Sequence, residues 1–211
     1  MAEFPDRFLS CCLGLKKLDL SHFTHVPKFP RYFLEMCTSL QFIDLTPMEH
    51  VTEIPRGFLN SCTSLTSLDL SPLSKASSIP MDFLMGCSAL TALDLSPLRN
   101  VTAIPMKFLE GCTGLTSLDL SGLQPFTDVE QVPQYFLNGC VGLTSIDLSP
   151  FSQLKQLPYG FLFGCSGLTS VDLTPLSTLT ELPCAFLHGF YFYMGYYSGL
   201  STIHGGVIIH Q

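Results

Sequence analysis

Two periodicities of hydrophobic positions meet within residues 55–79, and almost the whole chain repeats that stretch. Phe58, Cys62 and Leu65 are four and three residues apart, a spacing that places them on one face of a helix. Apolar and polar residues then alternate through the Leu-Asp-Leu of residues 68–70, as they do in a half-buried strand. The pattern predicts a repeating unit in which a short helix is followed by a strand.

A proline opens each copy of this unit, and the step between successive prolines is 25 residues, except for one step of 28. A fixed period of this length is the signature of a stacked solenoid. Proline suits the first position of a helix, and a glycine such as Gly114, just after the cysteine, suits its end. The opening prolines are Pro5, Pro30, Pro55, Pro80, Pro105, Pro133, Pro158 and Pro183.

The unit is similar to the leucine-rich repeat in its Treponema-type, or BspA-like, variant. Leu65, Leu68, Leu70, Leu73 and Ile79 carry the resemblance, and the pattern recurs along nearly the whole chain. The resemblance implies an α/β fold: a right-handed leucine-rich-repeat solenoid of about eight repeats of about 25 residues. It also implies a parallel sheet on the concave face and short helices on the convex side.

We expect one domain over residues 1–211, because 46% hydrophobic content can form a substantial core and no linker divides the chain. Regular repeats are expected over residues 1–187 and an irregular C-terminal cap over residues 188–211. In this last part an aromatic insertion precedes an eighth strand-like segment, with His204 in the aspartate position. The cap would cover a sheet edge that could otherwise support end-to-end self-association.

The charge balance narrows the classes of partner. Ten Lys and Arg residues stand against 17 Asp and Glu residues, and a net charge of −7 argues against nucleic acid. The imbalance is local, because Lys155 is the only base after residue 107. No membrane insertion is expected, since the most apolar stretch, residues 186–197, is too short to span a bilayer.

Phenylalanine and cysteine recur at fixed positions of the unit. The phenylalanines are expected to stack into a buried spine, each contributing roughly 1.5 to 3 kcal/mol before entropic costs. The cysteines occur singly, without the close pairs of a zinc site, so we expect buried free thiols rather than metal ligands or disulfides. The two columns are Phe8, Phe33, Phe58, Phe83, Phe108, Phe136, Phe161 and Phe186, and Cys12, Cys37, Cys62, Cys87, Cys112, Cys140 and Cys165.

A third column places an aspartate in each predicted strand. Parallel strands lie about 4.8 Å apart, so these carboxylates should line one face of the sheet and repel one another. Two interpretations stay open: serines such as Ser67 and Ser71 hydrogen-bond the carboxylates, or the row attracts a basic partner or weakly held Ca²⁺. Catalysis is disfavoured, because identical environments do not separate two pKa values. The candidate partner-binding members are Asp69, Asp94, Asp119 and Asp147.

Apolar residues replace polar ones at the second and sixth positions of the later units. These positions lie away from the phenylalanine and cysteine face, so the replacements predict either an exposed partner patch or a half-buried helix side. The residues concerned are Met81, Met85, Met106, Tyr159 and Phe163.

Two further phenylalanines are candidates for partner contacts. Phe42 stands among Ser, Thr and Ala on the expected concave face, where large anchors are otherwise scarce. Phe126 lies in the three-residue insertion between Pro105 and Pro133, in a loop where it either protrudes as a contact or forms a neutral surface bulge.

No catalytic group, cofactor site or metal-ligand spacing stands out. The resemblance therefore points to a non-enzymatic protein-protein interaction scaffold, with a protein partner of unknown identity. A cell-surface antigen or adhesin fragment is the alternative. The start of the chain shows no secretory leader, which favours the cytoplasm, whereas the resemblance implies the cell surface.

Overall fold

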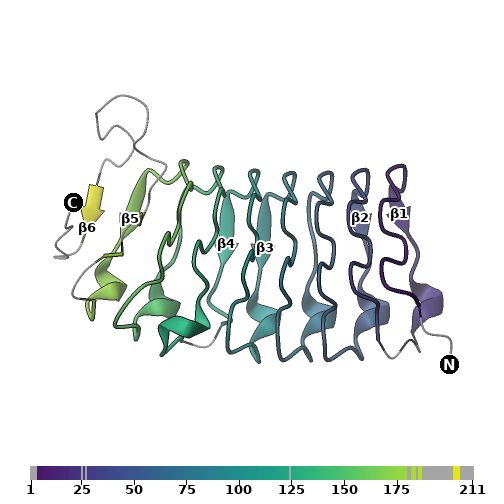
Figure 1. The fold of residues 1–211 in the computed structure, drawn as a ribbon, viewed down its shortest axis with the longest axis horizontal. Helices are drawn as coiled ribbons and strands as arrows, with labels where there is room; N and C mark the ends of the chain where they lie inside the picture. The colour runs from purple at the N-terminus through teal and green to yellow at the C-terminus, as the bar shows by residue number, and fades with distance from the viewer. Residues whose placement is uncertain are drawn as a thin grey trace.

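The chain forms a solenoid whose turns stand side by side from the N-terminal to the C-terminal end (Figure 1). The computed structural model describes residues 4–24, 26, 28–123, 125–179, 182–183, 185–186 and 202–204, the last of these as backbone alone. Residues 188–201, most of the expected cap, lie outside the described residues. None of the helices in the described part is long and apolar enough to cross a membrane.

Short parallel strands line one side of the solenoid. β1 (Lys17–Leu18) pairs with β2 (Phe42–Ile43), β3 (Ala92–Asp94) with β4 (Ser117–Asp119), and β5 (Ser170–Asp172) with β6 (Thr202–His204). The register joins equivalent positions of successive units, such as Leu93 with Leu118. Asp172 is the Cα partner of His204, which confirms that His204 holds the aspartate position of a late strand.

Most strand segments lead into a 3₁₀ helix of three residues, and these helices follow one edge of the solenoid (Figure 1). In most of them a proline occupies the first or second position, where its fixed φ fits and its missing N–H is not needed. They are η1 (Ser21–Phe23), η2 (Thr46–Met48), η3 (Ser71–Leu73), η4 (Ser96–Leu98), η5 (Val129–Gln131), η6 (Ser149–Phe151) and η7 (Thr174–Leu176).

The prediction of a helix after each opening proline is wrong. Gly57, Leu59 and Ser61 have φ of +68°, +55° and +59°, so every second residue is left-handed, whereas an α-helix needs negative φ throughout. Their N–H groups bond to neighbouring units instead, for example Gly57 to the Met81 carbonyl at 3.1 Å and Ser61 to the Met85 carbonyl at 2.7 Å. The described residues contain no α-helix, because hydrogen bonds between stacked turns replace those along a helix.

The glycine after the cysteine is also not a helix end. Gly114 does not have the positive φ of a left-handed cap. A Cβ at this position would lie 2.3 Å from the Ser88 carbonyl oxygen. Close approach to the preceding unit explains this glycine in place of a left-handed cap.

The phenylalanine spine is confirmed. Phe108 lies between Phe83 and Phe136, with ring centroids 6.2 Å apart on each side and interplanar angles of 5°. Phe33, Phe58 and Phe161 are buried in the same column. One continuous hydrophobic core therefore runs through successive turns.

The cysteines behind this spine are buried free thiols, as expected. Six of the seven predicted members are fully buried, and each donates its S–H to a leucine carbonyl of the preceding unit. The Sγ of Cys62, for example, lies 3.2 Å from the Leu34 carbonyl oxygen. Burial raises the pKa of Cys62 and of Cys112 to about 12.

Candidate functional site

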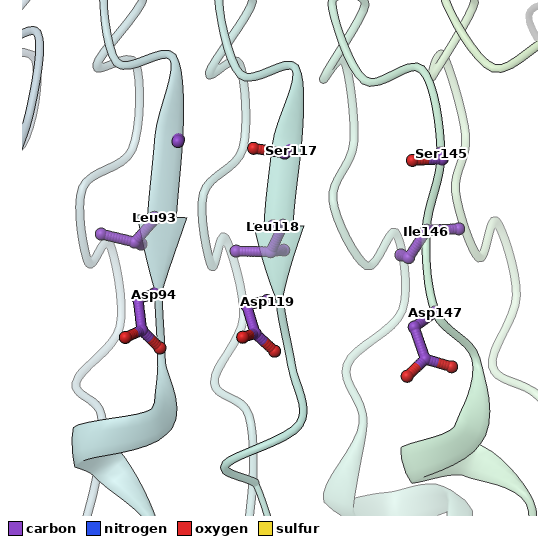
Figure 2. A pocket seen from close by; sticks show the side chains of 9 residues that line it. Leu93, Asp94, Ser117, Leu118, Asp119, Ser145, Ile146 and Asp147 are labelled. Carbon is purple, nitrogen blue, oxygen red and sulfur yellow. The ribbon is translucent and has the colours of Figure 1, made fainter.

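Two exposed surfaces are candidates for binding. The strand face consists of the outward side chains of the strand segments, and it holds the aspartate column. Figure 2 shows Asp94, Asp119 and Asp147 in one row on adjacent strand segments, beside an open groove that Ser117 and Ser145 also line. All four candidate aspartates are exposed.

The aspartates have hydrogen-bond donors two residues later in the chain, in line with one of the two interpretations of their sequence pattern. Each accepts a hydrogen bond from the backbone N–H two residues later, as Asp69 does from Ser71 at 2.8 Å. For Asp69, Asp94 and Asp147 this donor residue is the first of a 3₁₀ helix. Hydrogen bonds from the Ser71 hydroxyl and N–H lower the pKa of Asp69, and Ser121 does the same for Asp119. The column is explained by this turn contact, which favours the hydrogen-bonded interpretation over the cation-attracting one.

Within the described part of the chain, no group of three or more His, Cys, Asp or Glu side chains could hold a metal ion. Phe42 is a large aromatic side chain on the strand face. It lies in β2, is 54% exposed, and is the register partner of Lys17. Its exposure is as the sequence predicts.

The second surface, the turn face, comprises the exposed side chains at the second, third, sixth and seventh residues of each unit, counted with the opening proline as the first. Hydrogen bonds hold these positions of successive units together, since the N–H of Tyr32 donates to the Arg56 carbonyl and that of Tyr135 to the Tyr159 carbonyl. Side chains at equivalent positions are therefore neighbours along the solenoid.

Charged side chains dominate the first half of the turn face. Arg7 pairs with Glu35 at 2.6 Å, and Arg56 pairs with Asp82 at 3.3 Å. The guanidinium carbons of both arginines lie over the ring of Tyr32, at 4.6 and 5.8 Å from its centroid. This half is occupied by its own ion pairs and cation–π contacts.

Apolar side chains dominate the second half. Met106 is 59% exposed and Tyr159 is 44% exposed, and Met81 is exposed as well. Met85 and Phe163 are half-buried. The interpretation as an exposed patch therefore holds for Met81, Met106 and Tyr159, and the interpretation as a half-buried side holds for Met85 and Phe163. The sixth position of the unit packs closer to the core than the second.

The sequence reasoning missed Tyr135, which is 40% exposed at the centre of this half. Its ring contacts Tyr159 and Phe163 edge to face, with centroids 5.3 and 5.7 Å apart. The signal was present in the sequence: Tyr32 and Tyr135 share the third position, and each is followed one unit later by a glycine.

Phe126 corrects another prediction. It is 1% exposed and stacks on Phe151 with centroids 5.4 Å apart, so it neither protrudes nor forms a surface bulge. The insertion instead carries η5, whose capping box joins Asp128 and Gln131, and the large ring fills the core beneath it. Burial of an aromatic ring in a loop outweighed the general tendency of insertions to be exposed.

Comparison with known proteins identifies the family of the chain. A family model described as a BspA type leucine rich repeat region matches residues 2–91 and 77–186, in six copies. No curated protein matches the chain closely enough to count as a relative.

Several solved structures are similar to the chain. A leucine-rich repeat protein from Bacteroides ovatus is 17% identical, with a TM-score of 0.38, and the match covers 92% of this chain and 62% of that one. The functional domain of InlJ from Listeria monocytogenes, described as including a cysteine ladder, is 18% identical with a TM-score of 0.28. That match covers 81% of this chain and 46% of the InlJ chain. From the family match over residues 2–186, the chain belongs to the BspA-type leucine-rich repeat family.

Proposed function

We propose that this protein is a non-enzymatic scaffold that binds a protein partner through the second half of its turn face. Leucine-rich repeat proteins generally serve as protein-protein interaction scaffolds, and the chain belongs to that group. The observation that carries the proposal is the set of exposed Met106, Tyr135 and Tyr159 side chains on units that are neighbours. Large apolar side chains gathered on a surface mark interaction sites.

The strand face is a weaker candidate for the same role. Its aspartates accept hydrogen bonds from backbone N–H groups two residues later, and most of its other side chains are small. Binding hot spots are usually Tyr, Trp or Arg residues. Phe42 is the strand face's aromatic anchor among the described strands, whereas the turn face offers Tyr135 and Tyr159 together.

Photo-crosslinking compares the two faces directly. A benzoylphenylalanine placed at Met106 is expected to crosslink the partner in a lysate, and the same group at Asp94 on the strand face is expected not to. Mass spectrometry of the adduct identifies the captured protein. Capture from Asp94 and not from Met106 would move the binding site to the strand face and contradict the proposal.

The charge substitution Met106→Glu tests whether the patch is free in the isolated protein. Because Met106 is largely exposed, we expect the free energy of unfolding to change by no more than about 0.5 kcal/mol. Met85→Glu is the matched comparison, and we expect a larger loss because Met85 is half-buried. Denaturant unfolding of both variants measures the difference, and equal losses would contradict the assigned exposures.

A further inference from the structure

Two tyrosines occupy the same place in two different units. Tyr32 and Tyr135 each lie over the glycine found at the third position of the following unit. A Cβ on Gly57 would lie 2.3 Å from Cδ1 of Tyr32, and a Cβ on Gly160 would lie 2.6 Å from Cδ1 of Tyr135. Both glycines have φ of +68°, so the two rings rest on matching backbone.

The neighbours of the two rings differ. Tyr32 lies near the guanidinium groups of Arg7 and Arg56, and both make cation–π contacts with its ring. At Tyr135, Lys107 stands where Arg7 stands in the first site, and its Nζ lies 3.7 Å from Asp82. Tyr159 takes the place of Arg56. The second site therefore repeats the ring and its glycine with an aromatic residue where the first has an arginine.

The net charge of the chain after residue 107 favours a cationic ligand over an anionic one. After residue 107 the chain has one base, Lys155, against seven acidic residues. An excess of one sign of charge attracts ligands of the opposite sign and speeds their association. The seven are Glu110, Asp119, Asp128, Glu130, Asp147, Asp172 and Glu181.

We propose that the cluster Tyr135, Tyr159 and Phe163 receives an arginine side chain from a basic segment of the partner. The guanidinium lies against the exposed rings of Tyr135 and Tyr159, as those of Arg7 and Arg56 lie over Tyr32. The inference rests on the proposed function and adds to it the chemistry of the partner: a positively charged peptide with arginine as its anchor.

Arginine fits better than lysine for a geometric reason. The guanidinium is planar, is weakly hydrated, and stacks on aromatic faces while its N–H groups stay available to acceptors. A lysine ammonium makes the same long-range attraction but is a strongly hydrated point charge. If net charge alone determined binding, arginine and lysine peptides would bind with equal affinity. A higher affinity for the arginine peptide therefore indicates contact between the guanidinium and the aromatic rings.

The probe is a synthetic nonapeptide with three arginines separated by Gly-Ser spacers, compared with versions carrying lysine or uncharged citrulline. Binding to the full chain is followed by fluorine NMR after labelling its tyrosines with 3-fluorotyrosine. We expect the arginine peptide to bind about threefold to tenfold more tightly than the lysine peptide, and the citrulline peptide not to bind measurably. The Tyr135 and Tyr159 signals should shift, and the Tyr32 signal should not.

Three variants assign the effect to the cluster. Tyr135→Leu combined with Tyr159→Leu should weaken the arginine peptide at least tenfold, while Tyr135→Phe with Tyr159→Phe keeps the ring faces and the affinity. Tyr159→Arg places an internal guanidinium where Arg56 stands in the first site, and it should compete with the peptide. Phe42→Leu on the strand face is the control and should leave affinity unchanged.

The outcomes separate this inference from the proposed function. Equal binding of arginine and citrulline peptides, or no effect of Tyr159→Arg, overturns the inference. Sedimentation that shows a dimer lost in Tyr159→Arg also overturns it, because a second copy is then the occupant. If the arginine peptide does not bind while a crosslinker at position 106 still captures a partner, the result contradicts the arginine anchor but not the proposed scaffold function.

Discussion

Phe108→Ala is expected to lower the free energy of unfolding by about 3 to 5 kcal/mol. Phe108 is 1% exposed and fills the space between Phe83 and Phe136 in the middle of the spine. Alanine would leave a cavity between two packed rings. The neighbouring units cannot move closely enough together to fill it. In a solenoid, each unit is stabilised largely by its interfaces with its neighbours, so one cavity weakens two interfaces.

Denaturant unfolding of Phe108→Ala and of Phe42→Ala measures this effect against a matched control. Phe42 is more than half exposed on the strand face, so its loss should cost about 0.5 kcal/mol or less. A loss below about 1 kcal/mol for Phe108→Ala would show that the spine does not carry the stability assigned to it.

The native protein is expected to hide most of its thiols from alkylating reagents. Cys11 is exposed, whereas Cys62 and Cys112 are fully buried, and burial raises the pKa of each of these two to about 12. Only the thiolate reacts, so a pKa about three units above the ordinary value lowers the reactive fraction roughly a thousandfold at pH 8. Steric protection adds to this effect, because the core must open first.

Iodoacetamide labelling followed by peptide mapping resolves each cysteine separately. Cys11, which is exposed, should label readily, and Cys62 and Cys112 should label far more slowly, by about a thousandfold. In denaturant all three should react alike, which is the internal control. Native labelling of Cys62 as fast as Cys11 would contradict the buried thiol column.

The repeat and its core could be predicted from the sequence because burial constrains residue type. Phenylalanine and cysteine recur in the regular units at the positions equivalent to Phe58 and Cys62. The spacing of these residues indicated both the period and the positions that face inward. The strands β3 and β4 and their register followed from the same alternation of apolar and polar residues and from the period, whereas residues 68–70 do not form a strand in the structure. The same reasoning singled out Met81, Met106 and Tyr159 but left open whether they are exposed or half-buried, and the structure shows that they are exposed.

The backbone of the turn segments could not be predicted in this way. A four-residue spacing of apolar positions is met both by a helix and by turns in which left-handed residues alternate. Sequence periodicity reports which side chains face inward and not how the N–H groups are satisfied. Hydrogen bonds between units, such as Gly57 to Met81, decide between the two, and these depend on tertiary contacts.

The candidate surface was predicted in part. Reasoning from the second and sixth positions found the methionines and Tyr159 but passed over Tyr135, because the third position varies between charged, aromatic and glycine residues. The role of Tyr135 becomes visible only in the structure, where its ring lies over Gly160 and contacts Tyr159, two residues of the next unit. Phe126 was misplaced because its burial depends on Phe151, a residue of the next unit.

Stacking of successive units in register is the claim on which the surfaces, the spine and the thiol column all depend. Proton NMR with selectively labelled phenylalanine tests it, using Phe108→Leu to assign the Phe108 ring. We predict nuclear Overhauser effects from the Phe108 ring to those of Phe83 and Phe136, which are 25 and 28 residues away in sequence. A well-resolved spectrum in which Phe108 contacts neither ring would contradict the account.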